Sequence, residues 1–228
     1  EHPWLLTQVL KEEWGHEGSV VSDWGAVNDR AAGVAAGLEL EMPGSGGIND
    51  RRIVEAVTAG QLDEADLDRA VERLLKVIYH AVDGHKDGAT YDAVAHHALA
   101  REVARDCIVL LKNEEGILPL SKKGTIAFVG AFAQKPRYQG GGSSHVNPTR
   151  MDTAYEAGLA LLEDQAQILY APGYALETAD SDPAWLAEAQ TAAGAADVAV
   201  VFIGLTDAFE SEGYDRTHMD LPANHIAL

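Results

Sequence analysis

The sequence has a single cysteine, Cys107, among its 228 residues. An intramolecular disulfide is therefore impossible within it, and a reducing compartment such as the cytoplasm is favoured without being required. Cys107 precedes the apolar run at residues 108–111. Apolar neighbours of this kind predict a buried, unreactive thiol rather than a nucleophile.

Long hydrophobic runs are also missing. No stretch approaches the roughly 18 apolar residues that a membrane-spanning helix needs, so we expect no membrane partner. Residues 1–4 have neither a basic segment nor an apolar segment of the kind that forms a signal peptide. They also lack an initiator methionine, so we expect the natural start to lie upstream and the localisation to stay open.

Basic residues are scarce: 17 lysines and arginines stand against 36 aspartates and glutamates, a formal charge of -19. Such an acidic surface argues against nucleic acid and anionic membranes as partners and suits neutral ligands. At 46% hydrophobic residues, the chain can bury two cores. A homo-oligomer is left open.

The first part of the chain, residues 1–83, has the rhythm of βα units: helix, strand, helix, strand and two helices. Its strands are predicted at 18–23, as a fully buried run, and at 38–42. A complete (β/α) barrel takes about 250 residues, so we interpret residues 1–83 as the C-terminal portion of a (β/α)8 barrel. The polar, glycine-containing residues 84–92 are predicted to be a linker.

Two helix starts in this part are marked by aspartates. Asp50 and Asp63 each precede a helical pattern, and aspartate is a preferred N-cap residue. The second helix carries a long apolar stripe, which predicts packing on a large surface.

In residues 93–228, predicted strands alternate with helices, which indicates an α/β fold with a mainly parallel sheet. The strands are expected at 125–130, 167–170 and 198–203, the last of them buried. The glycine-rich stretch at 139–145 is predicted to be a loop.

Asp23 and Trp24 come directly after the first predicted strand. The loops that leave the C-terminal ends of strands form the active sites of barrel and open α/β folds. A carboxylate beside an indole fits a sugar site, since one can attack the anomeric carbon and the other can stack on the ring. The alternative, which the pair taken alone favours, is an N-cap aspartate followed by a tryptophan packed in the core.

Residues 209–216 follow the last predicted strand and contain three carboxylates, a tyrosine and an arginine. A solvated acidic loop is one interpretation of this segment. A functional loop is the other, because Gly213 gives the backbone freedom to aim Glu212. Arg216 is expected to pair with Asp215 and organise the loop.

Five motifs occur in order along the chain: SDW at 22–24, LELEMP at 38–43, VLLKN at 109–113 with LPL at 118–120, GGGSS at 140–144 and SEGYDR at 211–216. Together they resemble glycoside hydrolase family three, the β-glucosidase-like enzymes. The resemblance covers essentially the whole chain. It implies a (β/α)8 barrel paired with an α/β sandwich domain, residues 93–228 here, and an active site between the two.

By this resemblance, Asp23 matches the nucleophile and Glu212 the general acid/base. Trp24 would wall the sugar pocket, and Ser143, with less support Ser144, would reach the sugar from the glycine-rich loop. Retaining hydrolysis needs two carboxyl groups about 5–5.5 Å apart, and the acid needs a raised pKa. No cofactor and no metal are implied, and the nine histidines show no metal-ligand spacing.

The family's sugar-binding residues on earlier barrel strands have no counterpart in this sequence, so we expect an incomplete sugar pocket. We also expect the second domain to be truncated. The expected function is a retaining β-glycosidase, of the β-glucosidase or β-xylosidase type, acting on β-linked oligosaccharides or glycosides. The alternatives are a β-N-acetylglucosaminidase or phosphorylase relative, which Glu212 argues against, a catalytically incomplete fragment, and a non-catalytic α/β binding domain.

Overall fold

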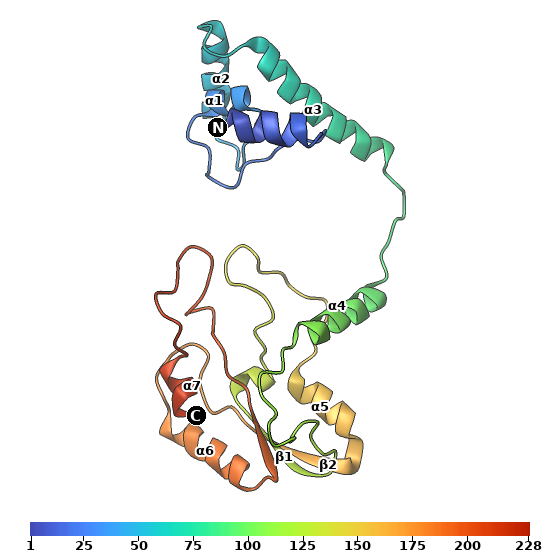
Figure 1. The fold of residues 1–228 in the computed structure, drawn as a ribbon, viewed down its shortest axis with the longest axis vertical. Helices are drawn as coiled ribbons and strands as arrows, with labels where there is room; N and C mark the ends of the chain where they lie inside the picture. The colour runs from blue at the N-terminus through green and yellow to red at the C-terminus, as the bar shows by residue number, and fades with distance from the viewer. The chain divides into compact units, whose positions relative to one another are not determined.

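The structure is a computed structural model, which describes the backbone of residues 1–228 and every side chain except that of Asp164. The chain divides into two compact units, Glu1–Tyr91 and Asp92–Leu228 (Figure 1). The fold is α/β, with a small parallel sheet in the second unit.

The first unit is mainly helical. Its helices are the π-helix η1 (Trp4–Glu13), α1 (Arg30–Ala36), α2 (Ile48–Thr58) and α3 (Glu64–Asp83). The core lies where α1 packs against α2 and α3, and its buried members are Val34, Ala56, Leu62 and Ala70. The helices expected from periodicity in this part of the chain are therefore present.

One of the two predicted N-caps is confirmed. Asp63 caps α3, because its Oδ1 accepts the Ala65 N–H at 3.0 Å. The prediction for Asp50 is wrong: α2 begins earlier, and Asp50 lies within its first turn. Gly47 takes the N-cap position at a φ of +85°, and the Ser45 hydroxyl accepts a backbone N–H of the first turn at 2.9 Å.

The two segments predicted as barrel strands pair only briefly. They meet in one parallel bridge, between Val21 and Leu40, flanked by hydrogen bonds from Ser22 N to Leu40 O (2.8 Å) and from Leu40 N to Val20 O (3.1 Å). Val21 is 46% exposed, so the prediction of a fully buried strand is wrong. Parallel strands are stable within sheets that are covered on both faces, and in the described residues each of these segments has only the other as a strand neighbour.

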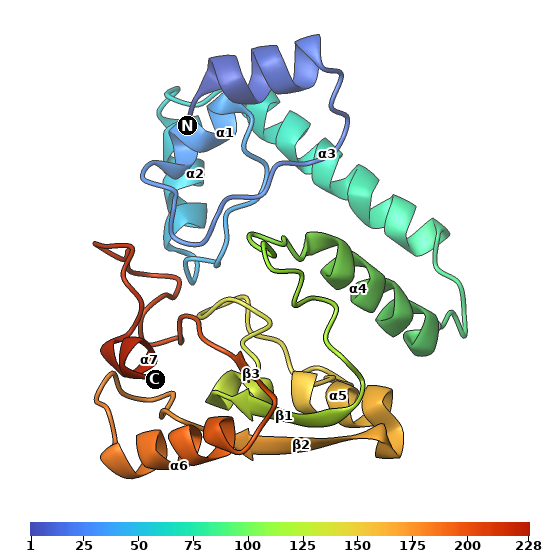
Figure 2. The same cartoon turned by 60° about the horizontal axis from the view of Figure 1, so that its bottom comes forward.

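The second unit contains a parallel sheet of three strands in the order β2-β1-β3. The strands are β1 (Gly124–Val129), β2 (Ala166–Ala171) and β3 (Val198–Val201). Helices α5 (Ala154–Leu162) and α6 (Pro183–Gly194) alternate with them along the chain (Figure 2). The predicted parallel sheet is confirmed.

The two helices cover opposite faces of this sheet. Side chains along a strand alternate between its faces: Ala127 and Val129 cluster with Ala189 of α6, whereas Phe128 lies on the other face. There it lies against α5, because a Cβ added at Gly158 would come within 3.1 Å of its ring. The unit is therefore a layered α/β structure.

Two predictions of burial in the second unit are wrong. Cys107, the last residue of α4 (Ala93–Cys107), is exposed, and the following apolar run is open as well, with Leu111 91% exposed. No described element packs over this run. The strand expected over 198–203 ends at Val201, and it is half-exposed because it lies at the edge of the sheet.

The remaining elements are short: η2 (Ala131–Ala133), η3 (Glu163–Gln165) and α7 (Ala223–Ala227). The predicted glycine-rich loop is present as irregular backbone at 139–145. In the described part of the chain, every helix is too short or too polar to cross a bilayer.

Candidate active site

The turn that carries Asp23 is fixed at its base by the neighbouring segment. The Ser22 hydroxyl accepts the Met42 N–H at 2.8 Å and lies 3.3 Å from the Met42 carbonyl oxygen, to which it donates. On the other side of the turn, the Gly25 N–H donates to the same carbonyl oxygen at 3.3 Å. Ser22 is buried, so these bonds hold both ends of the turn in place.

Asp23 and Trp24 themselves point into solvent. Trp24 is 65% exposed, and the Asp23 Oδ1 accepts only the adjacent Trp24 N–H among the hydrogen bonds found here, at 2.8 Å. The N-cap interpretation of Asp23 is wrong, because Asp29 caps α1 by accepting the Ala32 N–H at 3.0 Å. Packing of Trp24 in the core is excluded by its exposure, so carboxylate and indole are both available to a ligand.

Buried charged side chains bind the backbone segments next to this turn. The carboxylate of Glu39 is almost fully buried, forms an ion pair with Lys11 and accepts the Val20 N–H at 2.6 Å. The guanidinium of Arg30 donates to the carbonyl oxygens of Leu38 (3.0 Å) and Glu39 (2.8 Å). Burial lowers the pKa of Arg30 from its ordinary value. The sequence does not predict these roles for Lys11, Arg30 and Glu39. A signal exists for Glu39, which alternates with Leu38 and Leu40 and so points to the opposite face of the segment.

In the second unit, Glu212 lies against the glycine-rich loop. The Ser143 N–H donates to the Glu212 Oε2 at 2.6 Å, and the Glu212 N–H donates to the Gly141 carbonyl oxygen at 3.3 Å. A Cβ added at Gly142 would lie only 2.6 Å from the Glu212 Cβ. The loop therefore needs glycine at this position in order to bring its backbone to the carboxylate.

The hydrogen bonds from Ser143 hold the pKa of Glu212 below its ordinary value. The raised pKa that the sequence analysis expects is not present, because Glu212 is exposed and loses little solvation in this unit. The side chains of Ser143 and Ser144 are also exposed. The structure thus brings Glu212 and Ser143 together in one unit and Asp23 and Trp24 together in the other.

The loop around Glu212 is organised by a different arginine from the one expected. The side chains of Arg216 and Asp215, both described, form no ion pair, and the Arg216 Nη2 lies 3.9 Å from the Met219 Sδ instead. Arg137 instead binds Glu210, with Nη1 3.0 Å from its Oε2. Gly213 follows Glu212 at a φ of +95°, a conformation that glycine adopts without strain.

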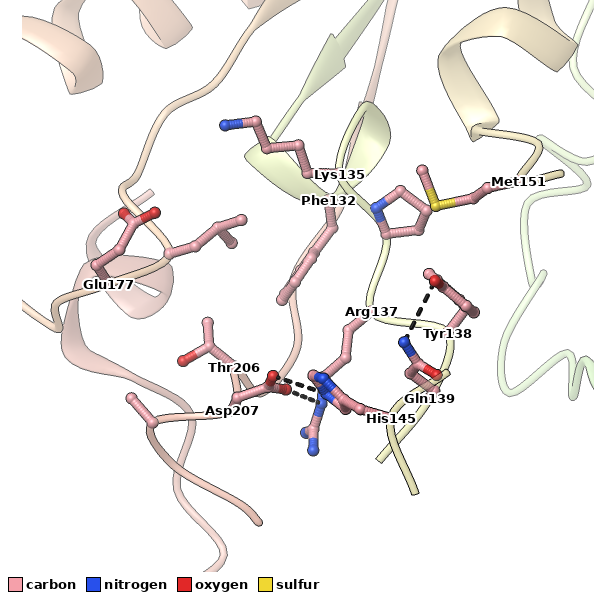
Figure 3. Close-up of a pocket in the computed structure, with 13 residues that line it drawn as sticks. Phe132, Lys135, Arg137, Tyr138, Gln139, His145, Met151, Glu177, Thr206 and Asp207 are labelled. Atoms are coloured by element: carbon pink, nitrogen blue, oxygen red, sulfur yellow. Dashed lines mark hydrogen bonds and ion pairs between the residues drawn. The ribbon is translucent and has the colours of Figure 1, made fainter. Parts of the chain in front are cut away.

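Two adjoining cavities lie beside this loop. One, of about 600 Å³, is lined by residues of both the glycine-rich loop and the Glu212 loop: Arg137, Tyr138, Gln139, Gly140, Gly141, Glu210, Ser211 and Glu212. The other, of about 710 Å³, shares the first three of these and adds apolar side chains such as Phe132 and Met151 (Figure 3). In the part of the chain that the structure describes, no three His, Cys, Asp or Glu side chains are grouped as a metal ion would require.

Comparison with known families gives two matches. The model described as "Glycosyl hydrolase family 3 N terminal domain" matches residues 1–77. The model described as "Glycosyl hydrolase family 3 C-terminal domain" matches residues 108–228. Each match falls within one of the two compact units.

Individual proteins are similar over the whole chain. "Thermostable beta-glucosidase B" from Acetivibrio thermocellus is 57% identical over 228 residues, which are 30% of its own length. "Exo-alpha-(1->6)-L-arabinopyranosidase" from Bifidobacterium breve is 42% identical over 238 aligned residues, 100% of this chain and 31% of that protein. The crystal structure of a GH3 beta-glucosidase from Bifidobacterium adolescentis has a TM-score of 0.87 and 41% identity, over 99% of this chain and 32% of that one. The chain therefore spans about a third of the length of the relatives it matches.

Proposed function

This chain belongs to glycosyl hydrolase family 3, and we propose that it carries the two catalytic carboxylates of a retaining β-glycosidase. The observation that carries the proposal is the seating of Glu212 against the glycine-rich loop, through the Ser143 N–H and the close approach of Gly142. A solvated acidic loop would have no need of that glycine.

The proposed architecture is a (β/α)8 barrel followed by an α/β sandwich. Residues 1–83 are assigned to the C-terminal portion of the barrel, 84–92 to a linker and 93–228 to the sandwich domain. The parallel bridge between Val21 and Leu40, with helices after each segment, supports the barrel assignment. The parallel sheet covered by α5 and α6 supports the second.

In the proposed mechanism, the Asp23 carboxylate attacks the anomeric carbon while Glu212 transfers its proton to the departing glycosidic oxygen. The products of this step are the free aglycone and a glycosyl ester of Asp23. Glu212, now a carboxylate, takes a proton from water, and the water oxygen attacks the anomeric carbon, whose bond to Asp23 breaks and releases the Asp23 carboxylate. The sugar is released with its original configuration, and both carboxyl groups return to their starting states.

The remaining residues are assigned to sugar binding. Trp24 supplies an exposed indole face beside Asp23, and sugar rings stack on such faces. Ser143 and Ser144 offer hydroxyl groups from the loop that holds Glu212, where they can bind hydroxyl groups of the sugar. This mechanism requires no cofactor.

Glu212 must be protonated in the first step, so its pKa has to be higher in the enzyme–substrate complex than in this structure. A bound sugar would displace water from the carboxyl, and loss of solvation raises the pKa of a carboxyl group. After the aglycone leaves, the Ser143 N–H favours the carboxylate, which is the form needed to activate water.

A β-glucoside is the first proposed substrate, because relatives named β-glucosidase share up to 57% identity with the chain. A β-xyloside is kept beside it from the family resemblance of the sequence motifs. The arabinopyranosidase relatives are 42% identical over the same residues and favour a second candidate, an α-L-arabinopyranoside. Assays with the p-nitrophenyl β-glucoside, β-xyloside and α-L-arabinopyranoside would rank the three by kcat/KM. A ratio favouring the third would replace the first candidate.

The roles of the carboxylates are tested with two variants of a catalytically active protein that contains this chain. Asp23→Ala should abolish turnover of every substrate, because no covalent intermediate can form. Glu212→Ala should retain the first step on aryl glycosides with good leaving groups, which need little protonation, and azide should restore part of its turnover. Asp215→Ala is the matched control and should stay close to the wild type. Equal loss on all substrates without rescue by azide would remove Glu212 from this role.

Stereochemistry tests the mechanism independently. NMR spectra taken in the first minutes of hydrolysis of a β-glucoside should show the β-anomer before mutarotation. Initial release of the α-anomer would mean inversion, and the assignment of Asp23 as nucleophile would be overturned.

A further inference from the structure

Arg137 lies just before the glycine-rich loop and binds the loop that leads to Glu212 at several points. Its Nη1 donates to the Leu205 carbonyl oxygen (3.3 Å) and to the Glu210 Oε2 (3.0 Å), and its Nη2 donates to the Glu210 carbonyl oxygen (2.8 Å). Its Nε lies 3.1 Å from the Asp207 Oδ1. The guanidinium thus spans the loop from Leu205, four residues after the end of β3, to Glu210, two residues before Glu212.

Its partners are held in turn by other groups. In Figure 3, Arg137 and the ring of His145 both approach the Asp207 carboxylate, and the His145 Nε2 lies 3.2 Å from Oδ2. The Tyr214 hydroxyl donates to the Asp207 carbonyl oxygen at 2.5 Å. His145 belongs to the glycine-rich loop and Tyr214 to the loop of Glu212, and both contact Asp207. The network therefore ties the two loops together.

This arrangement differs from an ordinary surface ion pair. The Arg137 side chain is only 19% exposed, and two of its acceptors are backbone carbonyl oxygens. A planar guanidinium presents several donors in a fixed geometry, so it fixes the path of a backbone and not merely a charge. In the part of the chain that the structure describes, the polar partners of Arg137 are Leu205, Asp207 and Glu210, and Glu212 is not among them.

We infer that Arg137 is a positioning residue that sets the place of the Glu212 carboxyl by clamping residues 205–210 to the segment preceding the glycine-rich loop. The inference rests on the proposed role of Glu212. Without the clamp, the hydrogen bonds that reach Glu212 itself are those with Ser143 and Gly141, both in a glycine-rich backbone. A displacement of about 1 Å can cost on the order of a hundredfold in rate.

The test uses Arg137→Met in a catalytically active protein that contains this chain. For glycosides with poor leaving groups, the value of kcat should fall at least about tenfold, which is part of the loss of about a hundredfold that a displacement of about 1 Å can cause. For dinitrophenyl glycosides the fall should be much smaller in the first step, while KM changes little. Arg137→Lys keeps the positive charge and loses the planar guanidinium, so its kcat should lie between those of the wild type and Arg137→Met. Arg150→Met is the control, because it removes an exposed ion pair with Asp152 in the same unit, and it should match the wild type.

A double-mutant cycle separates positioning from general damage. In the Glu212→Ala background, Arg137→Met should have almost no further effect on kcat, because its effect acts through Glu212. Independent, multiplicative losses would overturn the inference, as would equal losses on good and poor leaving groups. If Arg137→Met fails to fold, Arg137→Lys carries the same cycle.

Failure of the proposed function gives a different result. If Glu212→Ala shows no dependence on the leaving group and no rescue by azide, the role of Glu212 is wrong. If Glu212→Ala behaves as expected and the Arg137 variants do not depend on the leaving group, only the positioning inference is wrong.

Discussion

Gly142 is the residue on which the seating of Glu212 depends most directly. Its φ of +88° is unfavourable for any residue with a Cβ, and an added Cβ would lie 2.6 Å from the Glu212 Cβ and 2.8 Å from its Oε2. The same backbone brings the Ser143 N–H to the carboxylate. Gly142 therefore provides the space for the carboxylate and lets the next residue, Ser143, present its N–H as the donor.

We predict that Gly142→Ala lowers kcat about tenfold or more, because it displaces the acid/base carboxyl, for which about 1 Å can matter a hundredfold. Gly116→Ala is the matched control in the same unit. Its φ of +65° brings a similar backbone strain, but no atom lies within 4 Å of its added Cβ. Steady-state kinetics and thermal denaturation of both variants check the prediction. Equal losses of activity in the two would attribute the effect to strain alone.

The candidate carboxylates could be proposed from sequence, because Asp23 follows an apolar run, Glu212 precedes a glycine, and the family resemblance gives each a role. The contacts of Arg137 could not be predicted. Its partners Leu205 and Glu210 are 68 and 73 residues away along the chain, and only folding shows that they meet. Arg216, the nearer arginine, was therefore the wrong choice.

Helices were easier to predict than strands for a related reason. The α3 helix (Glu64–Asp83) is specified by its own cap and its own apolar stripe. A strand is stabilised by neighbours that are distant in sequence, so the segments around Val21 and Leu40 form one bridge where two strands were expected. The burial of β3 was misjudged because an apolar run cannot show whether its strand lies at the centre or the edge of a sheet.

The ion pair between Lys11 of η1 and Glu39, beside Leu40, contributes to the stability of the first unit in a way that can be tested. The side chains of Lys11 and Glu39 are 7% and 2% exposed. Lys11→Met leaves a buried carboxylate without its cation, and breaking a buried pair in this way costs about 3–5 kcal/mol. Lys76→Met removes the exposed pair with Glu72, at 59% and 64% exposure, and should have a much smaller effect, because exposed pairs are screened by solvent. Denaturant titration of both variants checks the difference, and equal effects would contradict it.

The α7 helix (Ala223–Ala227) brings a buried histidine against the segment after β3. His225 is 4% exposed, its Nδ1 accepts the Gly204 N–H at 3.2 Å, and its ring lies 3.7 Å from that of Tyr174. Burial lowers the pKa of His225. Protonation of Nδ1 would also break the bond to Gly204.

We predict that the second unit loses stability as the pH falls. Below the unfolded pKa of about 6.5, the unfolded chain binds a proton that the folded chain does not, so the free energy of unfolding decreases until the folded pKa is passed. Trp185, the one tryptophan of this unit, can report unfolding between pH 7.5 and 5. His225→Asn should flatten the pH dependence, and the exposed His218→Asn should leave it unchanged. An equally steep curve for His225→Asn would show that other groups cause it.

Across the whole molecule, apolar side chains are exposed to an extent unusual for a monomer. Val82, Val94, Ile108 and Leu111 are 65%, 75%, 77% and 91% exposed. Large exposed apolar patches favour association, whereas a formal charge of -19 opposes it through mutual repulsion. The two effects respond differently to salt, because salt screens charge and leaves apolar burial largely intact.

We therefore predict that the polypeptide of residues 1–228, expressed by itself, is oligomeric or poorly soluble, and more so as salt is raised. Light scattering after size-exclusion chromatography, between about 50 and 500 mM salt, where the screening length falls several-fold, measures this directly. Ile108→Ser combined with Leu111→Ser should increase the monomer fraction, since both side chains are open to solvent. The matched control is Ile126→Ser, which removes a buried isoleucine of β1 and should make association worse by destabilising the fold. A monomer with a sharp, cooperative thermal transition at every salt concentration would show that the exposed apolar surface does not drive association.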